Sequence, residues 1–246
     1  EKSRTSIRTA HTEDVTLTSV NWLERSDEII YGSESNGWRH LYLVDAEAGK
    51  LKNPVTTGEW IVRGIDRIDE TNRQVWFQAS GVFPDQDPYL VHFGRVNFDG
   101  SGLVFLTSGD GNHGEQYSPD RRFIIDTYSR VDLAPVNELR RVSDGKLVCP
   151  LEESDLTDLK SRGWEAPEVF VAKGRDCRKD IWVIICRPRE LDPSRKEPPI
   201  PELQAGPQGP FLPKALRTAH PHHGCNRPGF TCVNMWRMGM GLLLQG

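Results

Sequence analysis

The sequence lacks any apolar stretch long enough to cross a membrane as a helix. Its longest uninterrupted apolar run covers residues 181–186, whereas a membrane-spanning helix needs about 20 such residues. The chain also lacks a signal peptide and begins at Glu1 rather than at a methionine. That beginning suggests a fragment or a processed form. We therefore expect no membrane segment.

An excess of basic residues is missing as well. The 31 Lys and Arg against 35 Asp and Glu give a net charge of −4, and the two signs are mixed along most of the chain. A nucleic-acid-binding surface needs clustered basic residues. We therefore expect no nucleic-acid partner.

The five cysteines lack the paired CxxC spacing of common zinc and redox sites. Their odd number fits no disulfide framework, so the cellular compartment stays open. His220, His222, His223 and Cys225 are residue types that bind zinc, but their spacing matches no structural zinc site. We expect no metal site and no cofactor.

Acidic residues are absent from the C-terminal segment 203–246, although the chain has 35 of them. All three methionines fall in the same segment. We interpret residues 210–246 as an altered and poorly ordered tail, because the strands that would pair with it are missing. Ordering a residue without burial costs about 1–2 kcal/mol of chain entropy.

The first 153 residues contain a repeat of short strands separated by Gly, Pro, Asn and Asp turns. Three segments share one rhythm of four strands, and the spacing between segments is about 40–50 residues, which is typical of propeller blades. The strands are expected at 20–24, 28–32, 41–45 and 50–55, then at 61–68, 74–79, 89–97 and 103–107, then at 115–117, 123–128, 136–142 and 147–150.

This repeat predicts an all-β fold, a partial β-propeller of four-stranded antiparallel blades. A single blade cannot cover both of its faces and must stack on its neighbours. Because three blades do not close a circle, we expect the missing blades to lie upstream of Glu1.

Most conspicuous residues in the repeat have a structural explanation. Ser118-Pro119-Asp120 is typical of a turn, where proline presets φ and aspartate bonds to the nearby backbone. Trp38 is expected to pack between blades. His40 and His113 are alternatives for a ligand or a base, but neither has a partner at a defined spacing.

The pattern changes after Glu153. Residues 154–163 read as one short helix, with Ser154 or Asp155 as its cap and Gly163 after its end. Strands are expected at 168–173 and 180–187. We therefore divide the chain into a partial propeller at 1–153, the start of a second domain at 154–209 and the tail at 210–246.

Two stretches of the repeat resemble the blade motifs of dipeptidyl peptidase IV-like serine peptidases of the prolyl oligopeptidase family. They are Asn36-Gly37-Trp38-Arg39-His40-Leu41-Tyr42-Leu43 and Thr57-Gly58-Glu59-Trp60-Ile61-Val62-Arg63-Gly64-Ile65. The second domain is similar to the start of their α/β-hydrolase domain. It has Phe170 to Lys173, a turn at Asp176, a strand ending at Pro188, then Leu191-Asp192-Pro193-Ser194-Arg195-Lys196 and Ala205-Gly206-Pro207.

The resemblance implies a propeller beside a hydrolase domain in which a Ser–Asp–His triad removes N-terminal dipeptides from peptide substrates. It also implies a tendency to dimerise, and it is compatible with a periplasmic or extracellular location. The chain departs from the family at the site of catalysis, because it contains no G-x-S-x-G elbow to present a nucleophile. The paired glutamates that hold the substrate amine in the family belong to an earlier blade.

Gln204 stands where the family has a tyrosine that assists the oxyanion hole. Its amide can donate a hydrogen bond in place of that hydroxyl. The sequence thus predicts no catalytic residues and a peptidase fragment that is inactive alone. The alternative is a non-catalytic propeller that acts as a binding module, but such a protein would not carry residues 168–207.

Overall fold

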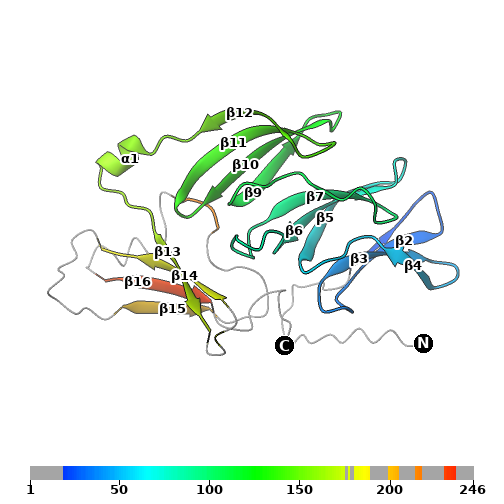
Figure 1. Cartoon of the computed structure of the whole chain (residues 1–246), viewed down its shortest axis with the longest axis horizontal. Coiled ribbons are helices and arrows are strands. Elements are labelled where there is room, and N and C mark those ends of the chain that lie inside the picture. The colour runs from blue at the N-terminus through cyan, green and yellow to red at the C-terminus, as the bar shows by residue number, and fades with distance from the viewer. Residues whose placement is uncertain are drawn as a thin grey trace.

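The computed structural model describes residues 19–174, 177, 180–188, 199–204, 214–217 and 230–236. Within these residues the strands form four sheets of four, and one short helix links the third sheet to the fourth (Figure 1). The described part of the chain is therefore almost entirely β-structure, as the repeat predicts.

The first three sheets are the three predicted blades, and neighbouring strands in each are antiparallel and follow chain order. The first blade comprises β1 (Ser19–Trp22), β2 (Glu28–Ser33), β3 (His40–Asp45) and β4 (Lys50–Pro54). The second comprises β5 (Ile61–Asp69), β6 (Gln74–Ser80), β7 (His92–Asn97) and β8 (Val104–Phe105). The third comprises β9 (Asn112–Tyr117), β10 (Phe123–Arg130), β11 (Leu133–Arg141) and β12 (Leu147–Glu153). The prediction of four-stranded antiparallel blades is confirmed.

Apolar side chains fill the space between successive blades. One buried cluster joins the first two blades and includes Leu41 and Phe77, and another joins the second and third and includes Trp76 and Ile124. Leu41, Phe77 and Ile124 are fully buried. Each blade thus covers its faces with its neighbours, and Figure 1 shows the three following one another in an arc.

The turn before β3 carries polar contacts between the first two blades. Arg39 Nη1 donates to the carbonyl oxygens of Val62 and Arg63, both at 2.7 Å, and Val62 N donates back to the Arg39 carbonyl at 2.8 Å. The sequence predicts Trp38 as the packing residue here, but Trp38 is only half-buried. The buried indole of this interface is Trp60, which is 8% exposed.

The two histidines considered as ligands or bases make buried hydrogen bonds within the fold. His40 Nδ1 lies 3.0 Å from Thr56 Oγ1, and its Nε2 lies 2.9 Å from the Gly58 carbonyl oxygen. His113 Nδ1 lies 2.7 Å from Asp126 Oδ1. Burial lowers the pKa of His40, which favours the neutral ring. Both residues are accounted for by blade structure.

A buried carboxylate links the first and second blades. Glu28, the first residue of β2, accepts from Lys52 Nζ at 2.6 Å and from Arg73 Nη1 at 2.9 Å. The Arg73 hydrogen bond, opposed by burial and aided by Lys52, lowers the pKa of Glu28 to about 2. A carboxyl group whose pKa falls on folding stabilises the fold above its unfolded pKa, and this contribution is lost on acidification.

We expect Glu28→Gln to remove part of the acid sensitivity of the fold. In the wild type, the Glu28 carboxylate contributes to the free energy of unfolding above about pH 4.5, and this contribution is lost as the pH falls toward about 2. Lys52 and Arg73 are half-exposed, so screening by water limits the contribution to about 1 kcal/mol. Urea unfolding at pH 7 and pH 3 measures the difference. The exposed Glu47→Gln is the matched control and should follow the wild type; an identical pH slope in both variants would contradict the assignment.

A fourth sheet follows the helix α1 (Thr157–Ser161), whose start is held by a hydrogen bond from Thr157 N to Asp155 Oδ1 at 2.8 Å. Its strands are β13 (Glu168–Lys173), β14 (Asp180–Cys186), β15 (Ile200–Gln204) and β16 (Cys232–Trp236), in the order β13-β14-β16-β15. β14 is antiparallel to both β13 and β16, whereas β15 and β16 are parallel.

The structure differs from the expected tail at β16. This strand lies between β14 and β15, where Val183 is opposite Met235 and Ile200 is opposite Cys232. Parallel neighbours need a long crossover connection, and residues 205–231 supply it. Apart from 214–217 and 230–236, the predicted tail lies outside the described residues. Among the described residues, no helix has the length and apolarity that a membrane crossing needs.

Candidate functional site at the junction of the propeller and the fourth sheet

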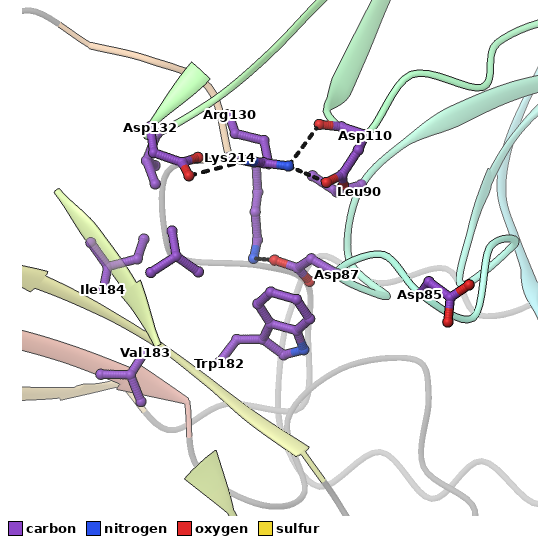
Figure 2. A pocket seen from close by; sticks show the side chains of 12 residues that line it. Asp85, Asp87, Leu90, Asp110, Arg130, Asp132, Trp182, Val183, Ile184 and Lys214 are labelled. Atoms are coloured by element: carbon purple, nitrogen blue, oxygen red, sulfur yellow. Dashed lines mark hydrogen bonds and ion pairs between the residues drawn. The ribbon is translucent and has the colours of Figure 1, made fainter. Parts of the chain in front are cut away.

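A cavity of about 200 Å³ lies where the propeller meets the fourth sheet. One side is formed by the fourth sheet, through Val169 of β13 and Trp182, Val183 and Ile184 of β14. Figure 2 shows the Trp182 side chain pointing toward Asp87 of the propeller, whereas Val183 points away from the propeller loops. Trp182 and Ile184 share one face of β14, and Ile184 packs against Val131 of the propeller, so this side of the cavity is an apolar wall.

The propeller contributes a charged rim from three of its loops. Arg130, at the end of β10, binds Asp132 through two hydrogen bonds, at 2.9 Å from Nε and 3.1 Å from Nη2. Its Nη1 also pairs with the carboxylate of Asp110. The Asp132 hydrogen bonds raise the pKa of Arg130. This two-pronged geometry fixes the guanidinium between two carboxylates, as Figure 2 shows.

Lys214 closes the cavity from a distant part of the chain. Its ammonium group pairs with Asp87 and lies 5.5 Å from the centre of the Tyr89 ring. Burial lowers the pKa of Lys214, and Asp87 opposes that shift. Burial and the nearby Asp87 charge raise the pKa of Tyr89 to about 12. The pair therefore holds the segment 214–217 against the propeller.

An apolar contact beside the cavity joins the two parts of the molecule. Val131 of the propeller packs with Ile184, Cys186 and Cys232 of the fourth sheet, and Tyr89 covers this cluster. All four residues of the cluster are buried. The cavity walls are consequently set by a packed joint.

The rim carries a net negative charge, because four carboxylates and only two cations line the cavity. Asp87, Asp110 and Asp132 are engaged in ion pairs with Lys214 or Arg130. Asp85 is exposed and forms no ion pair with any other described residue. An acidic rim beside an apolar wall is chemically suited to a ligand with a cationic amine and an apolar side chain.

A family model described as the dipeptidyl peptidase IV (DPP IV) N-terminal region matches residues 4–135, more than half of the chain. The chain belongs to the DPP IV N-terminal region family. This match confirms the resemblance of the blade motifs. It ends within β11, ahead of the fourth sheet.

Individual proteins named as dipeptidyl peptidases are similar to this chain beyond residue 135. Human dipeptidyl peptidase 8 is 26% identical over 218 residues, which cover 75% of this chain and 24% of that protein. The crystal structure of Porphyromonas gingivalis dipeptidyl peptidase 4 superimposes with a TM-score of 0.68 at 21% identity, covering 90% of this chain and 30% of that chain. A protein from Bacteroides ovatus described as a dipeptidyl aminopeptidase IV gives 0.66 at 20%, covering 90% and 34%.

This DPP IV-type chain therefore spans about a quarter of the human relative and about a third of each solved structure. At these identities the solved structures establish the fold alone. Their likeness covers 90% of the chain, so it includes more than the three blades.

The one predicted site residue, Gln204, is the last residue of β15, and its backbone is opposite Trp236. Its side chain lies outside the described residues, so its role at an oxyanion position stays a prediction. The cluster of His220, His222, His223 and Cys225 also lies outside them. Within the described part of the chain no group of His, Cys, Asp and Glu is arranged to hold a metal ion.

The sequence did not single out the residues that line the cavity. Residues 83–87 and 132–135 lie between predicted strands, where the sequence indicates only turns. Lys214 lies in the stretch interpreted as an altered tail. The available signal is that Arg130 and Asp132 stand two residues apart with opposite charges, and one such pair does not indicate a site.

Proposed function

We propose that this chain is the peptide-receiving part of a serine-type dipeptidyl peptidase, comprising propeller blades and the first strands of the peptidase domain. The observation that carries the proposal is that the likeness to solved structures with peptidase names covers 90% of the chain, so that it extends into the fourth sheet. A propeller that serves only as a binding module would have no need of that sheet.

The cavity at the junction gives the proposal its chemistry. The amino terminus of a peptide is a cation, and Asp85 is the rim carboxylate that no described cation engages. The first side chains of the peptide would lie against Trp182 and Ile184. The chain has no G-x-S-x-G elbow, so we propose that it binds such a peptide without cleaving it.

Binding of a Gly-Pro-Phe tripeptide tests this site by calorimetry on the 246-residue chain. We expect saturable binding of the free peptide and a loss for its N-acetylated form, which has no charge at the amino terminus. Asp85→Asn should weaken binding about tenfold, since a hydrogen bond to a charged group contributes about 1.5–3 kcal/mol.

Asp27→Asn is the matched control, because Asp27 is an exposed aspartate of the first blade far from the cavity. It should change the affinity by less than about twofold, as a distant surface charge is screened. Equal affinity for the free and acetylated peptides, or no saturable binding of either, would contradict the proposal.

A further inference from the structure

A second hollow, a groove of about 600 Å³, lies between the second and third blades and is rich in arginine. Five arginines line it: Arg67, Arg95, Arg121, Arg122 and Arg141. Only two acidic residues, Asp69 and Asp120, line it with them. The groove is therefore strongly positive within a chain whose net charge is −4.

Three hydrogen-bond donors at this groove have no acceptor among the described residues. They are Trp76 Nε1, Arg95 Nε and Arg121 Nη1, and all three atoms are buried. Trp76 is only 5% exposed, and an indole nitrogen can only donate. A buried donor left unsatisfied costs about 1–3 kcal/mol, so a ligand that accepts hydrogen bonds would be favoured here.

Arg121 is held over the groove by an unusual backbone conformation. It follows Ser118-Pro119-Asp120 in the predicted turn, where Arg121 N donates to the Ser118 carbonyl at 2.8 Å, and its φ is 52°. The guanidinium lies 5.0 Å from the centre of the Trp76 ring and 4.7 Å from that of Tyr117. A left-handed conformation at a non-glycine residue is strained, and such strain is often found at binding sites.

The equivalent contact between the first two blades shows what is missing at this groove. There Arg73, also with a φ of 52°, lies 4.8 Å from the centre of the Phe98 ring and reaches Glu28. Glu28 lies five residues before Ser33, which pairs with His40. In the next blade Gln74 lies five residues before Ala79, which pairs with His92.

Glu28 and Gln74 thus occupy the same position in successive blades. The contact between the first two blades contains its own carboxylate, Glu28, and the groove has the neutral amide of Gln74 at that place. Burial raises the pKa of Asp66 and of Glu115, and the nearby charge of Arg121 only partly opposes this rise. Neither carboxyl group forms an ion pair with Arg121. Asp69, Asp120 and Asp144 are already paired with Arg67, Arg122 and Arg141 respectively.

We propose that the groove between the second and third blades is a binding site for a multivalent oxyanion, of phosphate or carboxylate chemistry. The anion takes the place that the Glu28 carboxylate fills between the first two blades and accepts hydrogen bonds from Arg95, Arg121 and Trp76. Arginine is suited to this role because its planar fork binds both kinds of group through paired hydrogen bonds.

The test is calorimetric titration of the 246-residue chain with inorganic pyrophosphate and, separately, with citrate. We expect saturable binding of at least one of them, and the tighter arm identifies phosphate or carboxylate chemistry. The Trp76 indole N–H resonance, assigned with Trp76→Phe, should shift on titration, because the anion accepts its hydrogen bond.

Two variants separate a built site from general charge attraction. Arg121→Gly removes a cation and relaxes the left-handed backbone, so the fold should be kept while affinity falls at least about tenfold. Gln74→Glu supplies the carboxylate that Glu28 provides between the first two blades. It should raise the melting temperature and also weaken anion binding at least about tenfold.

Arg162→Gln is the matched control, because it removes one positive charge from an exposed side chain just after α1. Its affinity should remain within about twofold of the wild type. No saturable binding of either anion, or an equal loss of affinity in Arg162→Gln and Arg121→Gly, would overturn the proposal.

Discussion

Replacing Asp126 with alanine is expected to lower the free energy of unfolding by about 3–5 kcal/mol, because it breaks a buried charge network. Asp126 Oδ1 lies 2.7 Å from His113 Nδ1, and its Oδ2 lies 3.3 Å from Arg140 Nε. The side chains of Asp126 and His113 are fully buried, and that of Arg140 is 10% exposed. Without the carboxylate, the third blade would hold a buried guanidinium with less compensation.

Arg140 has other partners, and these limit the loss. Its Nη2 lies 2.7 Å from Glu138 Oε2, and its Nη1 donates to the Gly145 carbonyl at 3.1 Å. The contact with Asp126 Oδ2 is an ion pair without hydrogen-bond geometry. Asp126→Asn, which can keep the contact with His113, should therefore lose less stability than the alanine variant.

Urea unfolding followed by circular dichroism measures this effect, with an unchanged slope showing that the folded and unfolded states remain comparable. Asp158→Ala is the matched control, since Asp158 of α1 is 80% exposed and its one ion pair among the described residues is with Arg162. Exposed pairs of this kind contribute about 0.5 kcal/mol or less. A similar loss in both variants would show that burial of the Asp126 network does not matter.

The blades could be predicted from the sequence because their strands are defined by local signals. Turn residues bound each strand, and hairpin pairing follows chain order. The deviations have non-local causes. The strand expected at 103–107 ends at Phe105, because the Thr107 hydroxyl accepts from Phe93 N at 3.0 Å in place of a ladder bond. The strand expected from residue 115 begins at Asn112, whose side chain accepts from Val91 N at 3.2 Å.

The cavity could not be predicted, because its residues converge only in the folded chain. Asp87 and Lys214 are 127 residues apart in sequence. No local pattern marks either one, and they meet because the apolar cluster of Val131, Ile184, Cys186 and Cys232 joins the two parts of the molecule. β16 was missed for a related reason. The sequence offers Cys232 and Val233 as a short apolar pair, and its assignment as a strand depends on neighbours on both sides.

The largest functional effect that we expect is the absence of peptidase activity in this chain. Acyl transfer by a serine peptidase requires a serine on a strained turn, with a histidine within hydrogen-bond reach. None of the serines here occupies a G-x-S-x-G sequence. Gln204 can replace one oxyanion-hole donor, whose loss costs about 100- to 1000-fold, but it cannot replace a nucleophile. Loss of the serine nucleophile lowers kcat by roughly a millionfold.

The decisive measurement is hydrolysis of a Gly-Pro-amide reporter by the purified 246-residue chain, beside labelling with a fluorophosphonate probe. A serine peptidase with an intact elbow serves as the positive control for both assays. We predict no turnover above the buffer blank and no labelled serine. Turnover that the probe abolishes, together with covalent labelling of a serine in this chain, would contradict the account.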